Sequence, residues 1–122
     1  MDETPVIEAL NLVRRFGKVT AVDGLNLAIG RGEIFGLIGP DGAGKTTAIR
    51  LLAAVMPATA GRARVLGFDT TRQAERIRQA IGYMPQRFSL YGDLTVTENL
   101  HFFADLYDVR GPVRRRRIAE LL

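Results

Sequence analysis

The fold of this chain is decided by one short stretch, Gly39-Pro40-Asp41-Gly42-Ala43-Gly44-Lys45-Thr46-Thr47. It matches the template G-x-x-x-x-G-K-[ST] of a phosphate-binding loop, whose backbone N–H groups surround phosphates. Its glycines let the backbone curl without a Cβ penalty, and the helix expected over residues 46–56 directs its positive dipole end at the same place. Lys45 would supply a cation for the β- and γ-phosphates, and the Thr46 hydroxyl would supply a ligand for Mg²⁺. The alternative is a glycine-rich strand–helix turn that binds nothing.

The segments on either side of the loop predict an α/β fold. The apolar run over residues 33–38 is typical of a strand buried on both faces of a sheet, and open α/β sheets bind ligands at the carboxyl ends of such strands. Two earlier runs with alternating apolar residues, 6–13 and 19–29, predict half-buried antiparallel strands. The later elements expected are strands at 62–66 and 81–84, a helix at 71–80, a helix capped by Thr95 or Thr97 that runs to about Tyr107, and a last helix after Gly111-Pro112.

The bulk composition limits the class of protein. The 122 residues make one domain at most, and the chain has no cysteine for a disulfide or a thiolate metal site. The start, Met1-Asp2-Glu3, is acidic where a secretory signal is basic, and no apolar stretch approaches the roughly 18 residues of a membrane span. The net charge of +4 lies entirely in residues 110–122, where four consecutive arginines predict an exposed helix start. We therefore expect a cytoplasmic protein that binds no nucleic acid.

Several kinds of enzyme share such a loop, so the loop alone does not choose among them. A GTPase needs D-x-x-G after a buried strand; Asp108 to Gly111 fits the letters but follows an expected helix, and no N/T-K-x-D element is present to read the base. A small-molecule kinase needs an arginine-rich lid, and nothing in the sequence places residues 114–117 near the loop. A dinucleotide fingerprint fails because Thr47 stands where G-x-G-x-x-G needs its last glycine.

The order of the motifs resembles the nucleotide-binding domain of ATP-binding cassette (ABC) transporters over nearly the whole chain. Phe16-Gly17 stands where that family has an adenine-stacking aromatic, and residues 81–86 resemble its Q-loop. The likeness also covers the Walker A region and three further segments, 19–27, 57–61 and 94–100. Within the family, the stretch 91–100 and Phe102-Phe103 are similar to the drug and polysaccharide exporter branch. The resemblance implies an incomplete P-loop NTPase core at 33–86, an N-terminal antiparallel β subdomain at about 5–32, and the truncated start of a helical subdomain at 87–122.

Carried over to this chain, the resemblance assigns roles to individual residues. Phe16 would stack on adenine, Val22 would pack near the ribose, and Gln86 would sense the γ-phosphate through Mg²⁺ or water. Thr46 would reach the same Mg²⁺, and Thr47 would reach the α-phosphate. The implied nucleotide-binding residues are Phe16, Val22, Gly39, Pro40, Asp41, Gly42, Ala43, Gly44, Lys45, Thr46 and Thr47.

Two of these residues depart from the family pattern. Asp41 stands where the family usually has Asn, so we expect its carboxylate to face away from the phosphates. Phe16 replaces the commoner Tyr, which keeps the stacking surface and loses only a hydroxyl.

Three family motifs are absent after Gln86: the Leu-Ser-Gly-Gly-Gln signature, a Walker B strand ending in Asp-Glu, and the switch His. His101 is no substitute, because it falls within an expected helix and is expected to pack or to lie at the surface. We therefore expect these 122 residues alone not to hydrolyse ATP.

The resemblance implies the ATP-binding subunit of a transporter, of which this is the N-terminal half. In the full-length protein it would bind Mg-ATP and couple hydrolysis to transport. It would be peripheral to the inner membrane through a transmembrane permease, and would dimerise with a second nucleotide-binding domain. The alternative is an inert, truncated nucleotide-binding fragment.

Overall fold

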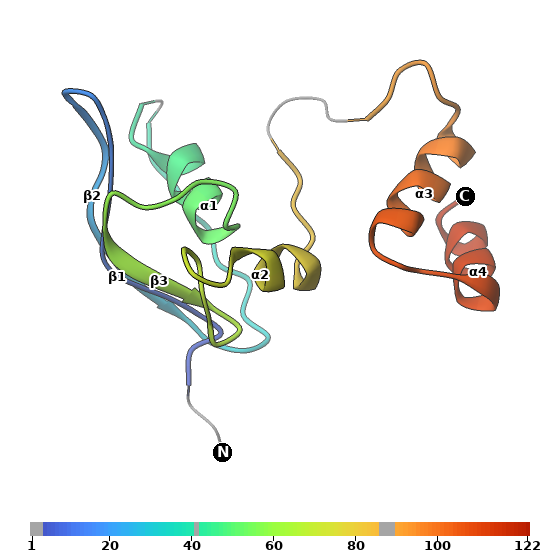
Figure 1. The fold of residues 1–122 in the computed structure, drawn as a ribbon, viewed down its shortest axis with the longest axis horizontal. Helices are drawn as coiled ribbons and strands as arrows, with labels where there is room; N and C mark the ends of the chain where they lie inside the picture. Colours follow the sequence, from blue (N-terminus) through green and yellow to red (C-terminus); the bar gives the residue numbers. More distant parts are fainter. Residues whose placement is uncertain (1–3, 41, 86–89) are drawn as a thin grey trace. The chain divides into compact units, whose positions relative to one another are not determined.

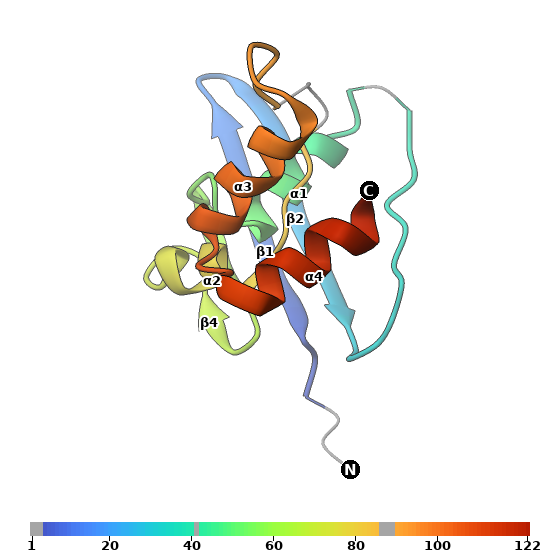
Figure 2. The ribbon, with the colours of Figure 1, turned by 90° about the vertical axis from the view of Figure 1, so that its right-hand side faces the viewer.

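The computed structural model describes residues 4–40, 42–85 and 90–122, which fall into two compact units that divide between Tyr83 and Met84. The first unit is built on a four-stranded antiparallel sheet in the order β2-β1-β3-β4, of which Figure 1 labels β2, β1 and β3 and Figure 2 labels β4. Its strands are β1 (Ile7–Phe16), β2 (Val19–Ile29), β3 (Ala60–Val65) and β4 (Phe68–Asp69). The antiparallel pair expected for residues 6–13 and 19–29 is confirmed, and so is the short strand expected near 62–66.

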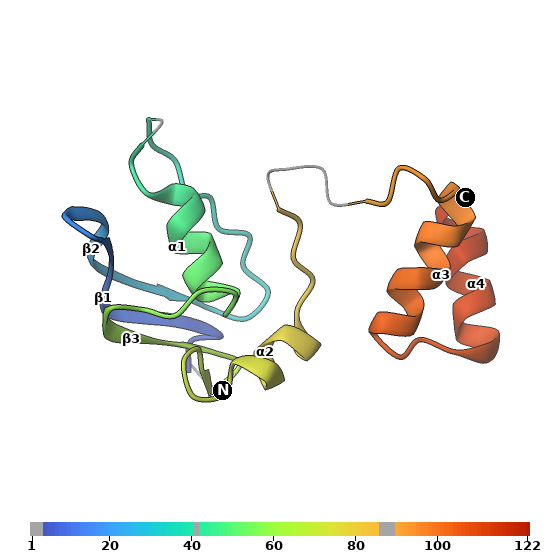
Figure 3. The same cartoon turned by 45° about the horizontal axis from the view of Figure 1, so that its top comes forward.

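Helix α1 (Lys45–Leu52) packs on one face of this sheet (Figure 3). Its buried side chains, Ala48 and Leu51, meet apolar side chains from three strands in the main core, which comprises Ala9, Leu12, Val22, Ala48, Leu51 and Ala63. Burying this apolar surface is the main force that holds the helix against the sheet. The core therefore fixes the helix that follows the glycine-rich loop.

The end of α1 differs from the expected one. The helix was expected to run to Met56 and to stop at Pro57, but it ends at Leu52, followed by Ala54 with a left-handed φ of 61°. The turn places Ala54 in a second core cluster with Val65 and Ile77. Burial of the Ala54 side chain in this cluster thus accompanies the end of the helix, several residues before Pro57.

Helix α2 (Ala74–Ala80) contributes Ile77, which is fully buried in that second cluster. A helix was expected over residues 71–80, but its first three positions form a turn around the Asp69 carboxylate. This carboxylate accepts hydrogen bonds from the backbone N–H groups of Thr71 at 2.8 Å and Arg72 at 2.9 Å. Side-chain bonding of this kind competes with the helix and delays its start.

Two strand predictions are wrong. Residues 33–38 and 81–84 form no strand, and Ile34 and Ile38 are 103% and 97% exposed. A strand persists only where a neighbour supplies hydrogen-bond partners, and an apolar strand buried on both faces also needs elements above and below it. Among the described residues, no strand pairs with either segment, and the sheet consists of β2, β1, β3 and β4 alone.

The second unit contains helices α3 (Val96–Leu106) and α4 (Gly111–Leu121). Thr95 caps α3: its hydroxyl accepts from Glu98 N at 3.1 Å, and Glu98 Oε1 accepts from Thr95 N at 2.8 Å. Asn99 is buried and secures the preceding turn, donating from Nδ2 to Tyr91 O at 3.1 Å and accepting from Tyr91 N at 3.0 Å. The helix expected from this capping sequence is confirmed, with Thr95 rather than Thr97 as the cap.

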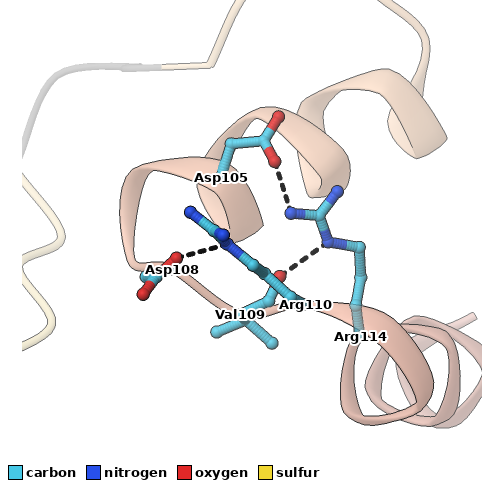
Figure 4. A network of polar contacts seen from close by, with 5 residues as sticks. All are labelled: Asp105, Asp108, Val109, Arg110 and Arg114. Carbon is cyan, nitrogen blue, oxygen red and sulfur yellow. Dashed lines mark hydrogen bonds and ion pairs between the residues drawn. The ribbon is translucent and has the colours of Figure 1, made fainter.

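Two arginine side chains form ion pairs at the turn between the two helices of this unit, and that of Arg114 joins α4 to α3 (Figure 4). Arg114 Nε donates to Val109 O at 2.7 Å, and its Nη2 pairs with Asp105, while Arg110 pairs with Asp108 at 2.5 Å. No residue of α4 is buried, as expected for the arginine run, and His101 is exposed on α3. Within the described residues, no helix has the length and apolar character needed to cross a membrane.

Candidate functional site

Two left-handed glycines shape the loop before α1. Gly42 has φ of 83° and Gly44 has φ of 88°, a region that an L side chain occupies only at a cost. Ala43 N donates to Pro40 O at 3.2 Å, which closes a turn between them. Helix α1 begins directly after Gly44, with Ala48 N donating to Gly44 O at 2.8 Å. The start of the helix is therefore where the sequence predicts it.

Lys45 turns back over this loop. Its Nζ donates a hydrogen bond to the backbone carbonyl of Gly39. An ammonium carries three N–H donors, so this contact leaves donors for an anion. The first turn of α1 holds no acidic residue, so the lysine charge and the helix dipole make one electropositive region. Such a region favours a bound phosphate or another anion.

The backbone at Gly44 lies against strand β2. A Cβ added to Gly44 would lie 2.1 Å from the carbonyl oxygen of Ala21 and 3.6 Å from Cγ2 of Val22. Only glycine allows this approach, because the clash would be with backbone and not with a flexible side chain. The contact fixes the start of α1 on the hairpin formed by β1 and β2.

A hollow of about 390 Å³ lies beside this contact, lined by residues 21–26 of β2, by Leu37, Ile38, Ala43 and Gly44, and by Lys45 and Ala48 of α1. Its volume falls within the range of roughly 300–1,000 Å³ typical of ligand pockets. Four of the residues implied by the resemblance line it together: Val22, Ala43, Gly44 and Lys45. Val22 is only 7% exposed and belongs to the main core, so only a small part of its side chain is accessible to a ligand in the hollow.

Phe16 lies at the end of β1 and does not line the hollow as the described residues define it. Its side chain is 43% exposed, and the guanidinium carbon of Arg14 lies 4.6 Å from the centre of its ring. The hairpin end beyond β1 and the start of α1 lie at the same end of the first unit in Figures 1 and 2. An exposed aromatic ring at that end is suited to stacking on a base.

Two residues implied by the resemblance, Asp41 and Gln86, lie outside the described residues. Thr46 and Thr47 are half-buried in the first turn of α1, while Pro40 and Ala43 are exposed in the loop. The loop residues from Gly42 to Thr47 are therefore continuous with a helix whose N-terminus they form.

Sequence reasoning missed two parts of this region. One is Arg14, whose contact with Phe16 follows from strand geometry, since residues two apart on a strand share a face. That alternation was the available signal. The other is the Ala21 carbonyl beside Gly44, a contact between distant segments for which the sequence carries no local signal.

Comparison with known proteins bears on the whole chain. Residues 22–122 match the family model described as ABC transporter. The chain is 47% identical over 116 residues to the probable multidrug ABC transporter ATP-binding protein YbhF of Escherichia coli (strain K12), covering 95% of this chain and 20% of that protein. It is 39% identical over 119 residues to Nod factor export ATP-binding protein I of Ralstonia nicotianae, covering 98% of this chain and 37% of that protein.

A solved structure shares the fold. A dimeric ATP-binding cassette in a post-hydrolysis state, bound to ADP and Pi, superposes with a TM-score of 0.78 at 25% identity and covers 93% of this chain and 54% of that one. The fold is thus part of a P-loop NTPase cassette with an antiparallel β sheet and helices. The chain spans about half of that cassette and 20–37% of the two relatives named above. With the model match across most of its length, the chain belongs to the ABC transporter ATP-binding family, whose members include exporters.

Proposed function

We propose that this chain binds Mg-ATP, with the triphosphate on the loop before α1 and the base on Phe16. The observation that carries the proposal is the start of α1 at Lys45, directly after left-handed Gly44, with the lysine ammonium over the loop. A helix N-terminus, a curled glycine backbone and a cation converge there on one region. Together they recognise a polyphosphate.

The residues of the loop take distinct roles in this proposal. Gly39 to Lys45 surround the β- and γ-phosphates, and Thr47 faces the α-phosphate. The Thr46 hydroxyl and Gln86 hold Mg²⁺, whose oxygen preference suits a hydroxyl and an amide. Val22 supports the ribose. Asp41 lies outside the described residues, and we propose that its carboxylate is turned away from the phosphates because it would repel them.

For the whole protein, we propose an ATPase subunit that couples hydrolysis to transport, leaning to export. It would be peripheral to the inner membrane through a transmembrane permease and would work as a dimer with a second nucleotide-binding domain. The names of the two relatives, a probable multidrug transporter protein and a Nod factor export protein, support the exporter assignment. The domain parts proposed are a β part at about 5–32, a core at 33–86 and the start of a helical part at 87–122.

We propose further that these 122 residues alone do not turn over ATP. Hydrolysis needs groups that position the attacking water and neutralise developing charge. The sequence beyond Gln86 carries no acidic pair at the end of an apolar strand that could do so.

The test of nucleotide binding is Lys45→Ala, in the protein as its gene encodes it in full. A hydrogen bond to a charged group contributes about 1.5–3 kcal/mol, so we expect the ATP dissociation constant to rise by roughly ten- to a hundred-fold. Arg50→Ala is the matched control, because it removes one positive charge from the other end of the same helix. Isothermal titration with Mg-ATP measures both.

Two results would contradict the proposal. If Lys45→Ala bound ATP as tightly as the unmodified protein, the loop would not be the phosphate site. If the unmodified protein bound no ATP at millimolar concentration, the proposal that this chain binds Mg-ATP would be wrong.

A further inference from the structure

Arg14 has no role in the nucleotide site proposed above. It lies two positions before Phe16 on β1, and we propose that it is a positioning residue that holds the Phe16 ring in place for stacking on the nucleotide base. This inference rests on the proposed function and adds a residue to its base site.

The contact between the two side chains is direct. The guanidinium carbon of Arg14 lies 4.6 Å from the centre of the Phe16 ring, within the distance of a cation–π interaction. The guanidinium thus covers one face of the ring. Phe16 nevertheless remains 43% exposed, which leaves ring surface for a base. A flat cation behind a ring restricts the rotation that an exposed phenylalanine at a strand end would otherwise have.

The guanidinium is itself anchored to the framework. Arg14 Nη1 donates to the carbonyl oxygen of Pro57 at 2.7 Å, in the segment between α1 and β3. The same segment is fixed to β1 by two further bonds, from Arg15 N to Thr59 Oγ1 at 2.9 Å and from Thr59 N to Val13 O at 2.8 Å. Arg14 therefore ties the Phe16 ring to the chain that leaves the phosphate-loop helix.

The residue opposite Arg14 on the neighbouring strand lies next to the phosphate loop. Arg14 pairs with Val22 on β2, and Val22 lies beside the close approach of Gly44. Both ends of α1 thus contact the hairpin near Phe16: the start through Gly44, and the segment after the end through Pro57 and Arg14. The geometry fits a residue that keeps base and phosphate sites in a fixed relation.

Stability alone does not account for an arginine here. Its Nε is buried and has no hydrogen-bond partner among the described residues. A buried donor without a partner lowers stability, and an apolar side chain at this position would avoid that loss. What arginine adds is a planar cation that can lie on the ring and bond Pro57 at the same time.

The experiment separates base binding from phosphate binding. Dissociation constants for Mg-ATP and for tripolyphosphate with Mg²⁺ are measured by isothermal titration on the protein as its gene encodes it in full. The variants are Arg14→Ala, Arg14→Lys, Phe16→Ala and the Arg14→Ala/Phe16→Ala double variant. Arg15→Ala is the matched control, since it removes the neighbouring exposed charge, whereas the guanidinium over the ring is that of Arg14.

We expect Arg14→Ala to weaken ATP binding by about two- to five-fold, the range that a cation–π contact of this kind gives, and to leave tripolyphosphate binding unchanged. Arg14→Lys should fall between, because lysine keeps the charge without the planar stack. Phe16→Ala should weaken ATP binding more strongly, and the double variant should match Phe16→Ala alone. Arg15→Ala should change neither ligand.

Each contrary result has a separate meaning. Equal weakening of ATP and tripolyphosphate by Arg14→Ala would overturn the inference, because it would mark a general structural role. A further loss of ATP binding in the double variant would overturn it too. If Phe16→Ala left the ratio of the two affinities unchanged, the base site of the proposed function would fail, and if neither ligand bound the unmodified protein, its phosphate site would fail.

Discussion

Replacing Gly44 by alanine tests the contact that fixes the phosphate-loop helix on the sheet. The new Cβ would lie 2.1 Å from the Ala21 carbonyl oxygen, at a residue with φ of 88°. The left-handed conformation costs an alanine about 1–2 kcal/mol. Displacing backbone from a packed contact adds about 1–3 kcal/mol. We therefore expect Gly44→Ala to lower the free energy of unfolding by roughly 2–5 kcal/mol.

Gly42→Ala is the matched control for this experiment. Gly42 has nearly the same φ, 83°, and a Cβ added there meets nothing within 4 Å. This variant should lose only the conformational part, about 1–2 kcal/mol. Urea unfolding measures both, and an unchanged m-value shows that the denatured state is the same. Equal losses in the two variants would refute the reasoning, because the contact with Ala21 would then contribute nothing.

Two further predictions concern side-chain bonds to the backbone. Thr95→Ala should destabilise the unit that contains α3 by about 1 kcal/mol, because it removes the N-cap acceptor. Thr97→Ala, at the second residue of the helix, should change little in the same urea titration. The backbone N–H of Arg72, and after it that of Thr71, hold the pKa of Asp69 below its ordinary value, although desolvation opposes them. Because the folded pKa is the lower one, this stabilisation is complete above the unfolded pKa and is lost as the pH falls through the folded value. Asp69→Asn should remove this dependence of stability on acidic pH. The melting temperature of the variant should therefore fall less between pH 5 and about pH 3 than that of the unmodified protein. An identical fall in the two proteins would contradict the prediction.

Local sequence rules predicted those elements whose backbone hydrogen bonds or dihedral angles depend on residues of the same segment. The start of α1 follows from Gly44 and Lys45, and the start of α3 follows from Thr95 and Glu98. The β1–β2 hairpin follows from alternating apolar residues on either side of a turn. The candidate phosphate loop could therefore be named from the sequence, because its conformation depends on glycines and on the helix that follows.

The two missing strands show where local rules fail. Residues 33–38 carry a strand-like apolar run, yet Ile34 and Ile38 are almost fully exposed. Their β propensity is real, but a strand in the middle of a sheet takes its hydrogen bonds from other segments. The described part of the chain offers these residues no such neighbour.

The sequence by itself thus determined the family, the loop with its glycines and lysine, and the elements that are stabilised by their own turns and caps. Only the tertiary structure decided that α1 ends at Leu52, that Gly44 meets the Ala21 carbonyl, and that Arg14 bonds Pro57. The physical reason is the range of the interactions. Caps and left-handed glycines act within a few residues, whereas burial of Ala54, strand pairing and the Arg14 contact with Pro57 join segments that meet only when the chain folds.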